Sequence, residues 1–135
     1  MNRAELVMRI SEACAEYEGF YKTNSPAQRN NNPGNLRSWG KTPVVDGFAK
    51  FPTPVEGWNA LRRQVDKNVG RGLTLVQFFA GVRDASGKVL PGKYSGYAPA
   101  ADKNYPTRYA AYVAKRVQIP ADVPLNKLYV KSDAI

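Results

Sequence analysis

Any acid–base chemistry in this chain must rest on carboxylates, tyrosines or lysines, because the sequence contains no histidine. Without histidine there is no Ser-His-Asp triad and no histidine base to activate a cysteine. The single cysteine, Cys14, stands among apolar residues, which predicts a buried small side chain and excludes an internal disulfide. The absence of histidine also disfavours a zinc site. We therefore expect neither a metal nor another cofactor.

Among the carboxylates, Glu18 has the position best suited to a general acid. Apolar residues recur at helical spacing from residue 3 to residue 18, and Gly19 is a typical helix stop. Glu18 is thus expected in the last turn of the first helix. The negative end of a helix dipole disfavours an ionised carboxylate, which suits a general acid working near neutral pH. Glu12 and Glu16 are the local competitors, and a merely solvated glutamate is the alternative.

A polar segment from residue 22 to residue 41 follows, and its composition predicts a long loop without regular structure. It contains the string Arg-Asn-Asn-Asn-Pro-Gly-Asn-Leu-Arg at residues 29–37. Asn amides can bind sugar hydroxyls and acetamides, but Asn, Pro and Gly are also ordinary turn residues. The two interpretations are balanced for Asn31 and Asn32, whereas a site role is favoured for Asn35.

Short signals predict the next elements. An Asp46-Gly47 turn between apolar runs indicates a β-hairpin over residues 43–51. Thr53-Pro54 is a good helix start, and Glu56 has a sufficient explanation as a capping residue, so we discount it as an acid. This helix is expected to end near Gly70 or Gly72. Its expected inward residues are Val55, Trp58, Leu61 and Val65.

The remaining sequence predicts further helical segments. Thr74 repeats the capping pattern before a short helix with Phe78 and Phe79, and a second long loop covers residues 84–104. Pro106 opens a helix to about Val117, with Tyr109, Tyr112 and Val113 inward, and residues 123–128 predict a final half-turn. The fold class is therefore mainly α (α+β), and a length of 135 residues predicts one domain over residues 1–135.

The net charge of +9 favours polyanionic surroundings such as nucleic acid, an anionic membrane or the acidic polymers of a bacterial wall. The basic residues are scattered, which is typical of a positively biased solvated surface. No nucleic-acid motif accompanies them, so a nucleic-acid partner is not expected. No apolar run approaches the roughly 20 residues of a membrane span, and the N-terminus does not resemble a signal peptide.

Several short motifs occur in a fixed order along most of the chain. Glu18-Gly19-Phe20 precedes the string at 29–37, and residues 48–51 (Phe-Ala-Lys-Phe) and 56–61 (Glu-Gly-Trp-Asn-Ala-Leu) follow. The order continues with Tyr97-Ala98-Pro99, Asn104 and residues 109–114 (Tyr-Ala-Ala-Tyr-Val-Ala). Together they resemble phage-type lytic transglycosylases and endolysins of the lysozyme-like superfamily. The Ala-Tyr-Asn-Ala-Gly and Gly-Leu-Met-Gln strings usual there are absent, which places the chain in a divergent branch.

The resemblance implies a lysozyme-like helical domain with a small β-hairpin that cleaves peptidoglycan with one carboxylic acid. The acid protonates the glycosidic oxygen between N-acetylmuramic acid and N-acetylglucosamine. As a carboxylate it then takes the proton of the muramyl C6 hydroxyl, and a 1,6-anhydro ring closes without water. Glu18 matches the position of that acid. The fold could bring Asp46 or Asp102 close as a second carboxylate, but Glu18 acting alone is favoured.

The resemblance also implies a tyrosine late in the domain that orients the acid. Tyr97 is the candidate by its order in the chain, with Asn104 as its neighbour. Tyr105 flanks the same loop, where an exposed ring can stack on a pyranose. The expected substrate-binding set comprises Asn32, Asn35, Arg37, Tyr97, Asn104 and Tyr105.

Three other functions remain open at this stage: a hydrolytic lysozyme (muramidase) on the same fold, a non-catalytic wall-binding or structural virion protein, and a nucleic-acid binder. The expected partner is the glycan strand of peptidoglycan, and the expected state is a monomer. Without a signal peptide, such an enzyme would be made in the host cytoplasm. It would then reach the cell wall through a holin or as a component of the virion.

Overall fold

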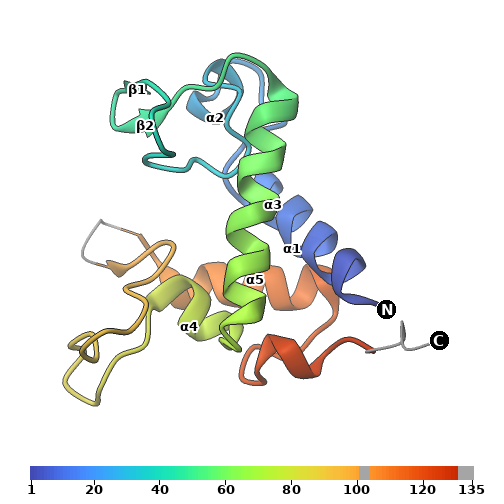
Figure 1. Cartoon of the computed structure of the whole chain (residues 1–135), viewed down its shortest axis with the longest axis vertical. Helices are drawn as coiled ribbons and strands as arrows, with labels where there is room; N and C mark the ends of the chain where they lie inside the picture. The colour runs from blue at the N-terminus through green and yellow to red at the C-terminus, as the bar shows by residue number, and fades with distance from the viewer. Residues whose placement is uncertain (101–103, 131–135) are drawn as a thin grey trace. The chain divides into compact units, whose positions relative to one another are not determined.

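The computed structural model describes residues 1–100 and 104–130 of the chain. Within these ranges the α-helices are α1 (Arg3–Tyr17), α2 (Pro26–Arg29), α3 (Pro54–Gly70), α4 (Leu75–Ala80) and α5 (Pro106–Val117). Strands β1 (Val44–Val45) and β2 (Phe48–Ala49) form a two-stranded sheet, and η2 (Leu125–Lys127) is a short 3-10 helix (Figure 1). The expectation of a mainly helical chain with a small β-hairpin is confirmed. The lysozyme-like arrangement stays a prediction.

The chain divides into two compact units. The N-terminal unit is Val7–Lys67, and the C-terminal unit combines Met1–Leu6 with Asn68–Ile135. The unit boundaries fall inside α1 and α3. The single domain over residues 1–135 stays a prediction.

The β-hairpin lies in the N-terminal unit and has the geometry that its turn residues favour. Val44 pairs with Ala49 and Val45 with Phe48 in antiparallel register. Asp46 and Gly47 both have positive φ, 52° and 85°, as a two-residue type I′ turn requires. The predicted hairpin and its turn are therefore confirmed.

Helix α3 begins at Pro54, and the Thr53 hydroxyl accepts the backbone N–H of Glu56 at 3.3 Å, which is one half of the predicted capping box. Its buried face differs from the predicted one in one respect. Leu61 and Val65 are fully buried, but Val55 is 67% exposed. Val55 precedes the buried Gly57 by two residues, or about 200° of helical rotation, so it lies on the opposite side of the helix.

The prediction that residues 22–41 form a loop without regular structure is wrong in part, because this segment contains α2. Ser25 is the N-cap of this helix, its hydroxyl accepts the backbone N–H of Gln28 at 3.1 Å, and Pro26 occupies the first helical position. These are the same start signals that identify α3. With four residues, α2 is too short to have an apolar period that the sequence could reveal.

In the C-terminal unit, α4 packs against α5 through aromatic side chains. Phe79 stacks on Tyr109 with ring centroids 4.0 Å apart, and Phe78 and Tyr97 lie beside them. The predicted inward positions of Tyr109 and Val113 are confirmed, whereas Tyr112 is 38% exposed. Tyr112 is about 100° from Val113 around the helix, at the edge of the buried face.

Hydrogen bonds cap a helix of the C-terminal unit and join segments of this unit that are distant in sequence. The predicted capping box at Thr74 and Gln77 is present at the start of α4. Leu125 N–H donates to the Leu73 carbonyl at 2.8 Å, and Val130 N–H donates to the Met1 carbonyl at 2.9 Å. Among the described residues no helix combines the length and apolarity that crossing a membrane requires.

A glycine inside α3 allows the closest approach between this helix and the Asn-rich loop. A Cβ on Gly57 would overlap the Asn31 carbonyl oxygen and lie 2.9 Å from Cδ of Pro33. We expect Gly57→Ala to lower the free energy of unfolding by about 3 kcal/mol, although Gly→Ala within a helix otherwise stabilises by roughly 1 kcal/mol. Urea unfolding followed by circular dichroism measures the difference.

Gly70→Ala, at the other end of the same helix, is the matched control. Its added Cβ would meet only the guanidinium end of Arg3, at 3.0 Å, and this flexible side chain can move away. We expect a stability within about 1 kcal/mol of the wild type. Equal effects of the two substitutions would contradict the close helix–loop contact at Gly57.

Candidate active site

Glu18 is the last residue of a hydrogen-bonded helix terminus that fixes its backbone. Helix α1 ends at Tyr17, and Gly19 follows with φ of 82°. Phe20 N–H donates to the Ala15 carbonyl at 3.0 Å, and Gly19 N–H donates to the Glu16 carbonyl at 3.1 Å. This pair of bonds defines a Schellman motif with Glu18 as the C-cap. The predicted helix stop at Gly19 is therefore confirmed, and the half-buried Glu18 occupies a rigid position.

The structure brings Asn35 next to Glu18. The Asn35 side-chain amide donates to Oε1 of Glu18 at 3.2 Å, across 17 positions of sequence. Asn35 has φ of 47°, in the left-handed region that asparagine tolerates better than most residues. Its Oδ1 atom is buried and accepts no hydrogen bond. Buried unsatisfied polar atoms are rare in proteins, and a catalytic role is one of the explanations for them.

Asn32 has a structural role instead of the predicted contact with substrate. It has no exposed surface, and its Nδ2 donates to the carbonyls of Leu36 and Ala49, both at 2.9 Å. Its Oδ1 accepts the backbone N–H of Leu36 at 2.9 Å. The side chain therefore joins the Asn-rich loop to β2. We correct its assignment accordingly, because a side chain enclosed in this way presents no atom to a ligand.

The preceding asparagines attach the same loop to the segment before α3. Phe51 N–H donates to the carbonyl of Asn30 at 2.9 Å, and the Asn31 amide donates to the Phe51 carbonyl at 3.0 Å. The Asn31 carbonyl in turn faces Gly57 of α3. Of the two interpretations open for Asn31, the structure favours the structural one.

The amide of Asn32 provides a direct test of this loop architecture. Asn32→Asp keeps the shape of the side chain but directs a carboxylate oxygen at two carbonyl oxygens. Because the charge would be buried and unpaired, we expect the free energy of unfolding to fall by about 3 kcal/mol or more. Thermal and urea unfolding of the purified variant measure the loss.

Asn59→Asp, on the exposed surface of α3, introduces the same chemical change at an accessible position. It should remain within about 0.5 kcal/mol of the wild type, as surface substitutions usually do. A similarly small effect for Asn32→Asp would contradict the role assigned to Asn32.

An aromatic pair missed by the sequence analysis supports the turn that carries Glu18. The ring of Phe20 meets the ring of Trp58 edge to face, with centroids 5.6 Å apart. Trp58 belongs to α3, so this contact joins the Glu18 turn to a second helix. The helical spacing of Trp58 indicated a core position but gave no indication of its partner.

Tyr21, three residues after Glu18, was also not singled out. Its side chain is 57% exposed, and its hydroxyl donates to Oε2 of Glu12 at 3.4 Å. Partial burial and then the charge of Glu12 raise the pKa of the Tyr21 hydroxyl. The carboxylate of Glu12 therefore accepts a hydrogen bond from Tyr21, whereas the carboxylate of Glu18 accepts one from Asn35.

Arg37 is exposed and its guanidinium lies over the ring of Phe48, 5.4 Å from the centroid. This cation–π contact associates the side chain with the hairpin. A contact between Arg37 and a substrate stays a prediction.

The other predicted site residues belong to the C-terminal unit. Tyr97 is half-buried in the aromatic cluster, and the Asn104 amide donates to the Pro99 carbonyl at 3.4 Å. Tyr105 is 64% exposed, with the guanidinium of Arg108 4.7 Å from its ring centroid. Asp102 lies outside the described residues. The participation of these residues in a site around Glu18 stays a prediction.

Glu18 presents a carboxyl group, which is able to transfer protons. Within residues 1–100 and 104–130, no three histidine, cysteine, aspartate or glutamate side chains are grouped so that they could hold a metal ion. Glu18 combines a fixed backbone with a neutral amide on one carboxylate oxygen. This arrangement can orient a carboxyl group for proton transfer. Comparison of the chain with protein-family models, curated proteins and solved structures gave no match.

Proposed function

We propose that this protein is a peptidoglycan lytic transglycosylase in which Glu18 acts first as general acid and then as general base. The observation that carries the proposal is the hydrogen bond from the Asn35 amide to Oε1 of a glutamate fixed at a helix C-cap. The motif order around Glu18-Gly19-Phe20 and residues 29–37 provides the substrate class by resemblance. We further propose a role in phage-associated wall degradation, with delivery by a holin or within a virion.

The Asn35 contact divides the work between the two oxygens of the Glu18 carboxyl group. Because Oε1 accepts the amide hydrogen bond, Oε2 is the oxygen that carries the transferable proton. It protonates the glycosidic oxygen as the bond to the muramyl C1 breaks, and the substrate acetamide stabilises the positive charge that develops there. The Glu18 carboxylate then takes the proton of the C6 hydroxyl while O6 bonds to C1. The 1,6-anhydro ring closes, and Glu18 is protonated again for the next cycle.

Glu18→Gln tests the acid directly. Glutamine keeps the size of the side chain but cannot donate and recover a proton in this way. We expect the rate of lysis of purified sacculi to fall at least about 100-fold, the usual contribution of a general acid, with unchanged thermal stability. Mass spectrometry of the wild-type products should find 1,6-anhydro muropeptides, which are lighter by one water than the products of hydrolysis.

Glu12→Gln is the matched control, because Glu12 lies on the same helix and bonds Tyr21. It should retain wild-type lysis within about threefold, since its loss removes only a weak surface contact. Full activity of Glu18→Gln would refute the assignment of the acid. Reducing muramic ends among the wild-type products would instead identify a hydrolytic lysozyme.

Asn35→Gly tests the positioning of the acid. Glycine adopts the left-handed backbone of Asn35 without strain but removes the amide that contacts Glu18. We expect kcat on soluble glycan fragments to fall about 10-fold with little change in KM, because the substrate still binds while the acid is less well oriented. An unchanged kcat in a variant that folds normally would contradict a positioning role for Asn35.

A further inference from the structure

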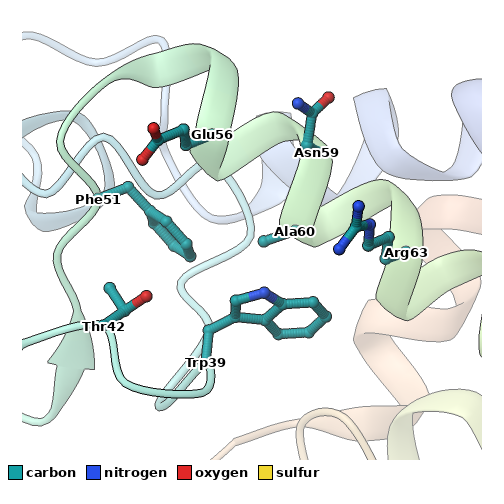
Figure 2. A pocket seen from close by; sticks show the side chains of 7 residues that line it. All are labelled: Trp39, Thr42, Phe51, Glu56, Asn59, Ala60 and Arg63. Atoms are coloured by element: carbon teal, nitrogen blue, oxygen red, sulfur yellow. The ribbon is translucent and has the colours of Figure 1, made fainter.

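A cavity of about 260 Å³ in the N-terminal unit lies between α3 and the two segments that flank the β-hairpin (Figure 2). Its walls come from Trp39, Thr42 and Phe51 on one side and from Glu56, Asn59, Ala60 and Arg63 of α3 on the other. Ala60 and Phe51 are buried and give the cavity an apolar base. Its volume is just below the range usual for drug-sized ligands, so its occupant is small.

The polar side chains of this cavity carry opposite charges at a defined separation. Glu56 and Arg63 are seven residues apart on α3, two helical turns, which places them on one face about 10 Å apart along the axis. Figure 2 shows Glu56 and Arg63 at different ends of the labelled stretch of α3, with Ala60 between them. At this separation the two side chains do not neutralise each other, in contrast to charges at i and i+4.

Both charged side chains are exposed, so their charges are solvated and open to a ligand. The backbone N–H of Glu56 bonds Thr53, but its carboxylate forms no ion pair with a described residue, and neither does the guanidinium of Arg63. Asn59 lies between them and uses only its oxygen, which accepts from Arg62 at 3.4 Å. The helix cap accounts for the backbone N–H of Glu56, and its side chain is part of the cavity lining.

We propose that this cavity binds a short zwitterionic peptide, with its ammonium group at Glu56 and its carboxylate at Arg63. Each residue of an extended peptide spans about 3.3–3.6 Å, so two to three residues match the separation of the charges. Arginine suits a carboxylate because its planar donors can form two parallel hydrogen bonds. The rings of Trp39 and Phe51 supply apolar surface on which small side chains would pack, and the Lys67 ammonium group lies 5.4 Å from the Trp39 ring centroid.

The ligand class follows from the two charges together. A simple anion would be repelled by Glu56, and a simple cation by Arg63. A neutral saccharide could use the aromatic wall and Asn59 but would leave both charges uncompensated. Because both charged side chains are exposed, binding should also weaken as the salt concentration rises.

Fluorescence of Trp39 can report binding in the full chain. Trp58→Phe removes the other of the two tryptophans and leaves Trp39, in the cavity wall, as the sole reporter. Trialanine with free ends is the probe, and its N-acetylated, C-amidated and doubly blocked forms are the comparisons. We expect saturable binding of free trialanine and at least tenfold weaker binding of each singly blocked form.

Charge-removing variants identify which end lies where. Glu56→Gln should weaken free trialanine at least tenfold but should not further weaken the N-acetylated form, whose ammonium group is already absent. Arg63→Gln should do the same with the C-amidated form. Arg62→Gln is the matched control, because this arginine is on the same helix but does not line the cavity, and it should bind like the parent.

Peptide binding in this cavity is independent of proton transfer at Glu18. Glu18→Gln should bind trialanine as the parent does, so failure of one proposal leaves the other intact. Equal binding of free and doubly blocked trialanine, unchanged binding in both Glu56→Gln and Arg63→Gln, or no saturable binding by the parent would overturn the peptide site. Binding of chitobiose at Trp39 without binding of trialanine would also overturn it and identify a saccharide site.

Discussion

The candidate site depends on the buried side-chain amide of Asn32. Its three hydrogen bonds join the backbone of Leu36 to that of Ala49, and Asn35 is held between Asn32 and Leu36. The backbone N–H of Asn35 also donates to the Asn32 carbonyl at 3.0 Å. A net contribution near 1 kcal/mol per bond is modest, but an unpaired buried amide or carbonyl costs about 1–3 kcal/mol. The arrangement is therefore kept by the penalty of losing any one partner.

The other half of the site depends on a backbone conformation that only glycine adopts easily. Gly19 has φ of 82°, and this allows both reversed hydrogen bonds that end α1. A side chain there would disturb the position of Glu18 without touching its carboxyl group. Phe20 adds a second attachment through Trp58. The glutamate and the asparagine are thus fixed by two separate devices, one on the helix end and one in the loop.

The sequence predicted the parts of this fold that local signals encode. Gly19, the Asp46-Gly47 turn and Thr53-Pro54 each impose a backbone conformation or cap within a few residues, and the structure confirms all three. The role of Asn32 could not be predicted in this way. The local sequence does not distinguish an asparagine in a turn from one in a binding site or in a buried network. The partner of Asn32, Ala49, is 17 residues away in the sequence. The Asn35 contact with Glu18 spans the same distance and was expected only as a shared site.

A neutral amide is a better partner than a charge for a carboxyl group that must work as both acid and base. An arginine or lysine on Oε1 would hold Glu18 ionised and oppose its first task, whereas a second carboxylate would oppose the later one. The Asn35 amide stabilises the carboxylate less strongly and can remain in place through both protonation states. An asparagine at this position is therefore consistent with one residue serving both steps of the proposed reaction. In a chain without histidine, the proposal assigns both steps to Glu18.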